Sequence, residues 1–309
     1  MKLYQKVKSI YKKVKSIYKE IEINLKYIAK SASIWTGSLV ASAQFICFLT
    51  DFNDVFPEEW KFFKRVLISL IVVTVVWIFA FVIKSFKTLT GESVEVINAG
   101  NNNHVYVEYG DLLEYADERR NVVVTANRCF DTIVDDDLIA SNTIHGKAIN
   151  KICVSGYHEK MLNESLQKDL FERRKINPEM ELTLDDKRKG NLMRYPAGTI
   201  AEFKKNNSDN ITYFFLGMSA FNKDLHAETT DKEYAIVIQS LIEYCNIRSN
   251  KIPIYIPIIG THSLNNKKQE RELLEYIVNA FRFNKNLINT DIHIVVYKGR
   301  RDEVSIYGL

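Results

Sequence analysis

The sequence predicts a three-layer α/β/α domain preceded by an N-terminal amphipathic helix and two transmembrane helices. Three observations support this. Lysines and regularly spaced apolar residues fill the first 30 residues, two long uncharged stretches follow, and strand-like and helix-like segments then alternate to the end. We therefore expect three parts, a basic amphipathic helix over 1–30, a transmembrane region over 31–84 and an α/β domain over 93–309.

Positive charge is concentrated at the N-terminus. The chain of 309 residues carries a net charge of +4, but residues 1–30 hold nine Lys and two Glu and so carry +7. The rest of the chain holds 33 basic and 36 acidic residues, a net −3. A body without excess positive charge does not favour nucleic-acid binding, so we expect no nucleic-acid partner.

The basic segment contains the block KVKSIYK twice in succession, at 6–12 and 13–19. Its apolar residues follow the i, i+3, i+4, i+7 spacing of one helix face, with Lys on the opposite face. They are Val7, Ile10, Tyr11, Val14, Ile17 and Tyr18. Two partners suit such a helix: the anionic surface of a lipid bilayer, or the same helix of another subunit in a short coiled coil.

Two uncharged stretches predict membrane-spanning helices. Residues 66–83, VLISLIVVTVVWIFAFVI, would extend as a helix for roughly 27 Å, close to the thickness of a bilayer core. Residues 31–50 are also uncharged but contain several polar side chains, so a helix lying on the membrane surface is the alternative. Small residues at four-residue spacing in this stretch would let another helix approach closely.

The flanking charges predict an orientation. The connecting residues 51–60 contain four acids and no base, whereas basic residues precede the first stretch and Lys84 and Lys87 follow the second. By the positive-inside rule both termini face the cytoplasm, although the basic residues within 61–65 partly oppose this.

In the last part of the chain, strand and helix patterns alternate. SVEVIN and HVYVEY flank the turn sequence AGNNN, which predicts a β-hairpin. The short apolar runs NVVVTA at 121–126 and IHIVVY at 292–297 are typical of strands buried on both faces. Apolar periodicity predicts helices over 146–174, 229–246 and 266–283.

Three predicted strands are followed by loops that carry candidate binding residues. The loops are YGDLL at 109–113, VTANRCFD at 124–131 with SNTIHGKAI at 141–149, and IPIIGTHSLNN at 256–266. Ligands of open α/β sheets bind beyond the carboxyl ends of the strands, and backbone N–H groups at a helix entrance bind anions. Two such loops could hold a diphosphate. The upstream glycine of a P-loop is missing before Gly146-Lys147, which disfavours a nucleoside triphosphatase.

At these loops the sequence resembles a macro domain, the α/β/α family that binds ADP-ribose. Gly110-Asp111-Leu112 is similar to the family's Gly-Asp-Ile, whose Asp accepts from the adenine amino group, and Asn127 is similar to the asparagine near the distal ribose. HGKAI and IPIIGTHS resemble the two phosphate loops. The resemblance implies these ligand-binding residues: Gly110, Asp111, Leu112, Asn127, Ser141, His145, Gly146, Gly260, Thr261, His262, Ser263 and Leu264.

Two spans joined to such a domain resemble the membrane-anchored macro-domain effectors of Thoeris, a bacterial anti-phage system. The resemblance implies no cofactor and a nucleotide second messenger as ligand. This messenger is an ADP-ribose derivative, histidine-linked ADP-ribose in this subtype, made from NAD by a TIR-domain partner. It also implies location in the bacterial inner membrane and abortive infection by membrane damage. Because two weakly polar spans cannot line a pore alone, we expect a homo-oligomer.

The sequence departs from the family at both phosphate loops. The first lacks the run of three glycines, and the second has His262 where a glycine is usual. Both departures disfavour hydrolase chemistry, so we expect a ligand-gated effector without catalytic residues. The alternatives are a membrane-tethered ADP-ribosyl hydrolase and a membrane scaffold whose macro fold binds only protein.

Several of these residues also have purely structural explanations. Asp111 can serve as a turn or capping residue, and His145 and His262 can be neutral loop histidines. The acids at 135–137 are expected to begin a helix rather than to bind a cation, and no metal site is expected. The four cysteines lack metal-ligand spacing and are expected to be reduced and inert.

Overall fold

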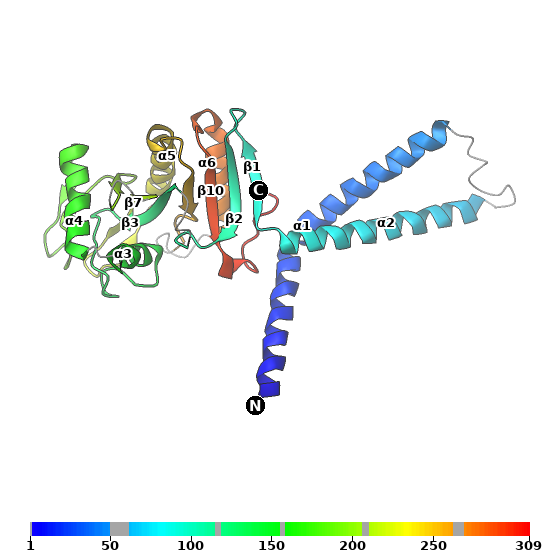
Figure 1. Cartoon of the computed structure of the whole chain (residues 1–309), viewed down its shortest axis with the longest axis horizontal. Coiled ribbons are helices and arrows are strands. Elements are labelled where there is room, and N and C mark those ends of the chain that lie inside the picture. The colour runs from blue at the N-terminus through cyan, green and yellow to red at the C-terminus, as the bar shows by residue number, and fades with distance from the viewer. Residues whose placement is uncertain (1, 50–61, 115–118, 155–157, 206–209, 262–268) are drawn as a thin grey trace. The chain divides into compact units, whose positions relative to one another are not determined.

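The computed structural model describes residues 2–49, 62–114, 119–154, 158–205, 210–261 and 269–309 (Figure 1). The chain divides into two compact units. A helical unit comprises Met1–Glu92 with Gly299–Gly308, and an α/β unit comprises Ser93–Lys298 with Leu309. The sequence places 299–308 in the C-terminal domain, whereas the contacts of Gly299–Gly308 place this segment with the helices.

The helical unit contains α1, Lys2–Leu49, and α2, Phe62–Thr90. α1 is one continuous helix, so the basic segment and the first predicted span are parts of a single element. Figure 1 shows that α1 changes direction beside the C-terminal end of α2. In this region Asn24 Nδ2 donates to the carbonyl of Glu20 at 2.8 Å, a local side-chain bond that competes with the helical hydrogen bonds.

The apolar part of α1 packs against α2. Ala32 and Ala80 are buried at this contact, and Trp77 Nε1 donates to Ser33 Oγ at 3.1 Å. A Cβ added at Gly37 would meet no atom within 4 Å among the described residues. The small-residue face at Gly37 is therefore not the face that contacts α2.

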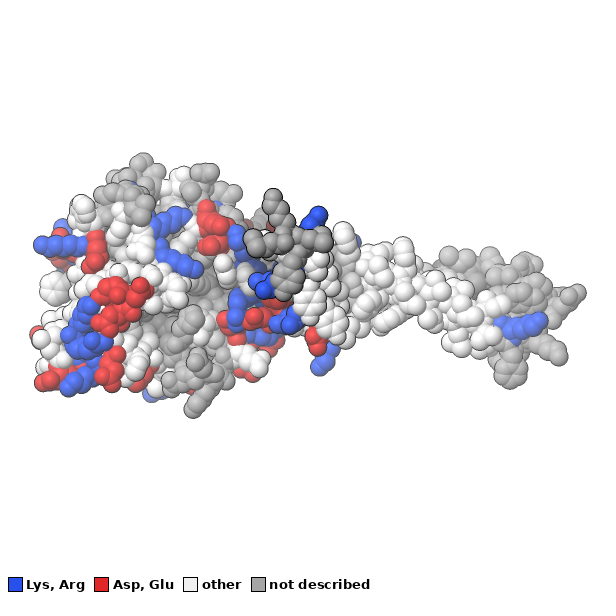
Figure 2. All heavy atoms as spheres, turned by 90° about the horizontal axis from the view of Figure 1, so that it is seen from below, with Lys and Arg blue, Asp and Glu red and all other residues white. Residues whose placement is uncertain are grey.

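Within the described residues, one helix is long and apolar enough to cross a membrane. It is Val66–Thr90, with a mean hydropathy of 3.1 in its most apolar window. On the face shown in Figure 2, the long apolar stretch of the helices is free of charged side chains, whereas charges of both signs are mixed over the α/β unit. The first predicted span, 31–50, stays a prediction, and the acidic connection at 51–60 lies outside the described residues.

The α/β unit is built on an eight-stranded mixed sheet with the order β1-β2-β10-β9-β3-β7-β6, in which β8 also pairs with β7. Its strands are β1 Ser93–Asn98, β2 His104–Gly110, β3 Arg120–Asn127, β6 Ile200–Phe203, β7 Ile211–Phe221, β8 Ala227–Glu228, β9 Ile254–Pro257 and β10 Ile292–Tyr297. β4, Met180–Glu181, and β5, Met193–Arg194, form a separate pair. The predicted hairpin is confirmed, because β1 and β2 pair antiparallel.

The helices of this unit are α3 Ile144–Val154, α4 Glu159–Lys168, α5 Asp231–Arg248 and α6 Glu270–Phe283, with a π turn at Asp169–Arg173 and a 3₁₀ turn at Lys285–Leu287. A further 3₁₀ turn, Lys298–Arg300, lies where the chain leaves this unit. The single helix predicted over 146–174 is wrong, since α3 and α4 are separate elements. His158, directly before α4, has an extended backbone with a φ of −90° and a ψ of 146°, so the helix is interrupted there. The helix expected to begin at 135–137 is also wrong. Asp135 Oδ1 instead accepts from the N–H groups of Asp137 and Leu138 in a turn.

Side chains alternate between the two faces of the sheet, which gives the three layers. Tyr213 and Phe215 of β7 join the core cluster that contains residues of α3 and α4. Phe214 points to the other face, where its ring meets Tyr244 of α5 edge-on at 5.3 Å. The predicted α/β/α architecture is therefore present, with helices on both faces of the sheet.

Candidate functional site

Parallel pairing gathers the predicted binding loops at one edge of the sheet. β2, β10, β9, β3 and β7 are neighbours and run parallel. Their carboxyl ends therefore share an edge, which carries Gly110 at the end of β2, Asn127 at the end of β3 and the loop with Gly260 after β9. β2 and β3 are three strand spacings apart, roughly 14 Å. This edge suits an extended ligand that lies across the strand ends.

Asp111 stands at the turn after β2. Its Oδ1 accepts from the N–H of Leu113 at 3.0 Å, and its carbonyl accepts from the N–H of Glu114 at 3.2 Å. Asp111 thus shapes the turn, as the structural explanation expects, while its second carboxylate oxygen has no hydrogen bond to described residues. Gly110 is buried beside β10, and Leu112 packs into the core. These two residues support the turn rather than present side chains.

Tyr297 is a candidate that sequence analysis overlooked. It ends β10 and lies beside Gly110 in parallel register. Its side chain is 52% exposed, and Lys147 Nζ lies 5.7 Å from the centroid of its ring. An exposed aromatic ring beside Asp111 offers a surface on which a nucleobase can stack. The signal was the final residue of IHIVVY, a tyrosine that follows two valines at the end of the strand.

Asn127 ends β3 and is 3% exposed. Its Oδ1 accepts from the N–H groups of Cys129 at 3.0 Å and Asp131 at 3.5 Å. Its Nδ2 is buried and has no partner among the described residues. The amide therefore fixes the turn after β3 with one end and keeps an unused donor at the other.

The loop before α3 is held by side chains. Thr143 Oγ1 accepts from the N–H of Gly146 at 3.1 Å and donates to the carbonyl of Ala140 at 2.7 Å. A Cβ at Gly146 would collide with that same carbonyl, so only glycine allows this close packing. Ser141 is exposed, and its N–H donates to Asp136 Oδ1 at 2.7 Å.

His145 lies in the interior of the unit. It is 8% exposed, its ring centroid is 6.0 Å from that of Phe215, and Nε2 has no partner among the described residues. Burial lowers its pKa to about 4, opposed in part by a backbone hydrogen bond with Asp131. The imidazole is therefore neutral at physiological pH. Contact between His145 and a ligand stays a prediction.

The second predicted phosphate loop is described only at its start. Gly260 is buried and has a φ of +100°, in the region that favours glycine. The preceding carbonyl of Ile259 accepts from the hydroxyl of Tyr234 at 3.1 Å, which ties the loop to α5. Thr261 is half-buried. The remaining predicted residues, His262, Ser263 and Leu264, lie outside the described residues.

A buried ion pair underlies the end of β3. Lys187 Nζ lies 2.7 Å from Asp131 Oδ2, with exposures of 0% and 1% for the two side chains, and also donates to the carbonyl of Asn191 at 2.7 Å. The N–H of Asn191 donates to Asp131 Oδ1 at 2.6 Å. Burial raises the pKa of Asp131, and Lys187 opposes that rise. The segment around Lys187 is thereby fixed to the turn that Asn127 begins.

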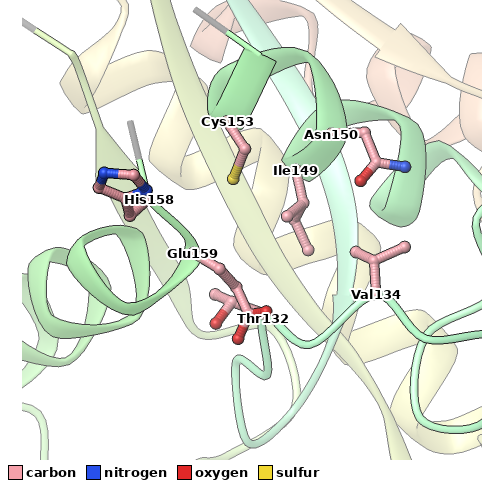
Figure 3. A pocket seen from close by; sticks show the side chains of 7 residues that line it. All are labelled: Thr132, Val134, Ile149, Asn150, Cys153, His158 and Glu159. Atoms are coloured by element: carbon pink, nitrogen blue, oxygen red, sulfur yellow. The ribbon is translucent and has the colours of Figure 1, made fainter. Parts of the chain in front are cut away.

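A cavity of ≈ 250 Å³ lies between the outer part of α3, the start of α4 and the segment after Asp131 (Figure 3). Its lining residues are Thr132, Val134, Ile149, Asn150, Cys153, His158 and Glu159. None of the predicted ligand-binding residues lines it.

Metal and thiol chemistry have little support in the described part of the chain. It contains no group of three or more His, Cys, Asp or Glu able to hold a metal ion. Burial raises the pKa of Cys129 to about 11, and burial also raises the pKa of Cys245. Both thiols are therefore protonated and unreactive.

The mixed sheet, its helices on both faces and the loops at its carboxyl edge define a macro-domain protein. Residues 105–297, more than half of the chain, match the family described as Thoeris protein ThsA, Macro domain, and the chain belongs to this family. A curated relative, the Thoeris protein ThsA of Bacillus amyloliquefaciens (strain Y2), is 26% identical over 220 residues, which cover 68% of this chain and 67% of the relative. The resemblance to Thoeris macro-domain proteins is thereby confirmed.

The buried ion pair yields a stability prediction. Lys187→Met should lower the free energy of unfolding by about 3–5 kcal/mol, because it leaves the Asp131 carboxylate buried without its cation. Adding Asp131→Leu should recover part of the loss. Lys189→Met is the matched control, since the partly exposed Lys189 pairs with Asp135 near the surface, and it should have little effect. Denaturant unfolding of the full chain in detergent measures all three, and equal effects at 187 and 189 would contradict the prediction.

The buried imidazole yields a pH prediction. Because its folded pKa of about 4 lies below the usual value of 6.5, the unfolded chain binds a proton more readily than the folded chain between these values. Stability contributed by neutral His145 is therefore lost as the pH falls through this range, by up to roughly 3 kcal/mol. His145→Gln should flatten the fall in melting temperature between about pH 7 and pH 4.5. The exposed control His226→Gln should follow the wild type.

Proposed function

We propose that this protein is a membrane effector of anti-phage defence whose macro domain binds an ADP-ribose-derived signal. Membership of the Thoeris ThsA macro-domain family supports the defence role. One observation carries the ligand proposal. Parallel pairing brings Asp111, Asn127 and Gly260 to the same edge of one sheet.

The edge offers a different chemistry at each end. At β2 the carboxylate of Asp111 can accept from an adenine amino group, and Tyr297 can stack on the base. The first turn of α3 and the loop after β9 suit a diphosphate. At β3 the unused Nδ2 of Asn127 can donate to a ribose hydroxyl. Histidine-linked ADP-ribose, supplied by a TIR-domain partner, is the specific signal that we propose.

We propose binding rather than hydrolysis. In a hydrolase of this fold, bare glycine backbone lets a water molecule pack against the substrate phosphate. Here the equivalent loop carries the side chains of Ser141 and Thr143, and the hydroxyl of Thr143 is engaged with Gly146 and Ala140. The loop is therefore built to hold a ligand in place.

The membrane part of the proposal rests on α2, with the apolar half of α1 as a second span. Both termini would lie in the cytoplasm of a multi-pass inner-membrane protein. The face of α1 at Gly37 meets nothing in the described chain, which leaves room for a helix of another subunit in a homo-oligomer.

The N-terminal arm of α1 completes this arrangement. Its apolar stripe is uncovered, with exposures of 54% at Ile10, 68% at Tyr11 and 59% at Val14. Lysines flank the stripe throughout the repeat. We propose that the arm lies on the anionic cytoplasmic leaflet, where its direction change beside α2 would turn it along the membrane surface (Figure 1).

Ligand binding is tested by thermal shift on the full chain in detergent. ADP-ribose, cyclic ADP-ribose isomers and histidine-linked ADP-ribose are compared at saturating concentration. At about a hundredfold excess over its dissociation constant, the bound ligand should raise the melting temperature by roughly 5 °C. Asp111→Asn and Tyr297→Ala should each weaken the shift. Glu114→Gln, one turn away from the base position, should preserve it. No shift with any compound would favour a protein-binding scaffold.

Membrane damage is tested with the full chain in dye-loaded vesicles of phosphatidylethanolamine and phosphatidylglycerol. Dye release should require the compound that raises the melting temperature, because occupancy is proposed to shift the helices. Asp111→Asn should abolish release at the same ligand concentration. Turnover of the compound, followed by chromatography of the same samples, would instead indicate the hydrolase.

A further inference from the structure

The segment after the last strand belongs to the helical unit. β10 ends at Tyr297, the family match ends at the same residue, and Gly299–Gly308 cluster with α1 and α2. Its sequence, GRRDEVSIYG, shows no regular spacing of apolar residues. Its contacts give it a definite role.

Arg301 joins both helices. Its Nε donates to Glu20 Oε1 of α1 at 2.6 Å. Its Nη2 donates to the carbonyls of Leu89 at 2.6 Å and Gly91 at 2.8 Å, at and just beyond the C-terminal end of α2. The last carbonyls of a helix lack partners within the helix and carry partial negative charge, so a guanidinium is well suited to cap them. Arg301 therefore caps α2 and ties it to α1.

Ser305 and Tyr307 extend the same contact. Ser305 Oγ donates to Asn24 Oδ1, in the part of α1 where the helix changes direction. The hydroxyl of Tyr307 donates to the carbonyl of Thr88 at 3.0 Å, and its ring stacks on Tyr27 with centroids 5.1 Å apart. Three residues of the segment thus bond or stack on α1, and two bond the end of α2.

The segment is packed as tightly as a protein core. Val304 and Ile306 are 2% and 0% exposed. A Cβ at Gly91 would collide with the hydroxyl of Tyr307, so the backbone after α2 lies directly against the segment. Dense packing with satisfied polar groups indicates a lasting contact rather than a loosely held tail.

The chain passes between the two units at residues 92–93, 298–299 and 308–309, and the first two of these passages start beside the end of β2. Ser93 pairs with Glu108 of β2, and Tyr297 pairs with Gly110 of the same strand. These two positions on β2 are roughly 7 Å apart along the strand. Asp111, the proposed adenine acceptor, follows directly.

We propose that Gly299–Gly308 is a strap that transmits ligand occupancy from the end of β2 to the membrane helices, and that the strap stays attached in both states. The inference rests on the proposed function. Arg301 donates to the carbonyl of Gly91, which lies just before the passage at 92–93. Arg301 lies just after the passage at 298–299. A displacement at the end of β2 therefore reaches both passages, and Arg301 conveys it to α1 and α2 together.

The test uses Arg301→Gln in the full chain, with Arg300→Gln as the matched control. Arg300 is the neighbouring residue, and its Nη1 pairs at 2.7 Å with Glu303 of its own segment. Both variants are assayed for thermal shift with histidine-linked ADP-ribose and for dye release from phosphatidylethanolamine–phosphatidylglycerol vesicles. Arg301→Gln should keep the wild-type shift and lose about tenfold in dye release at saturating ligand. Arg300→Gln should match the wild type in both assays.

Tyr307→Phe is a milder second variant if Arg301→Gln fails to fold. It removes only the hydroxyl that bonds Thr88 and should reduce dye release while leaving the thermal shift unchanged. Wild-type dye release by both strap variants would overturn the strap. Dye release by either strap variant without any ligand would overturn the strap as well. In that case the segment would act as a latch that keeps the helices in the closed state.

Failure of the proposed function has a different signature. A wild-type protein that shows no thermal shift, or shifts without dye release, would remove both the effector and the strap. A wild-type protein that shifts and releases dye, with strap variants that do the same, would leave the effector standing and reject the strap alone.

Discussion

The insertion of β10 between β2 and β9 is the constraint on which the rest of the structure depends. The last strand in the sequence occupies an interior position of the sheet and runs parallel to both neighbours. Parallel pairing then aligns the ends of β2, β9 and β3 at one edge, so loops distant in sequence meet where we propose that the ligand binds. The same insertion brings the chain out beside Gly110, and the C-terminal segment therefore starts where the proposed adenine position lies.

The buried ion pair of Asp131 and Lys187 fixes the position of neighbouring segments more than it adds to stability. A buried ion pair gains little over apolar packing, but its geometry is exacting because either charge alone is costly. Asp131 uses both carboxylate oxygens on the segment around Lys187, and its backbone N–H donates to the amide of Asn127. The orientation of Asn127 is thus coupled to a segment about 60 residues further along the chain. A purely apolar contact would permit small rotations that this network forbids.

Local patterns predicted the elements, and long-range contacts escaped prediction. The alternation in SVEVIN and HVYVEY identified the hairpin, and the apolar run IHIVVY identified β10 at its observed bounds. The acids at 135–137 suggested a helix start, yet Asp135 bonds its own turn and pairs with Lys189 from a distant segment. Nothing in DDKRKG singles out Lys187, because its partner Asp131 is 56 positions away. The partners of Arg301 lie on α1 and α2, more than 200 residues earlier, and no periodicity reveals such a pairing.

The free energy needed to change the arrangement of the helices can be compared with the free energy of the contacts between the strap and the helices. Turning a two-state protein from nearly all closed to nearly all open requires a ligand to prefer the open state by about 5.5 kcal/mol. This preference can change the arrangement of the helices only if the contacts between the strap and the helices contribute at least as much free energy as the change requires. A single exposed ion pair contributes about 0–1 kcal/mol and would detach first. Hydrogen bonds to a charged group contribute about 1.5–3 kcal/mol each, and Arg301 makes them to Glu20, Leu89 and Gly91. The summed free energy of these three hydrogen bonds is of the order that the change requires. A guanidinium bonded to both helices can therefore transmit the change while its own hydrogen bonds stay formed.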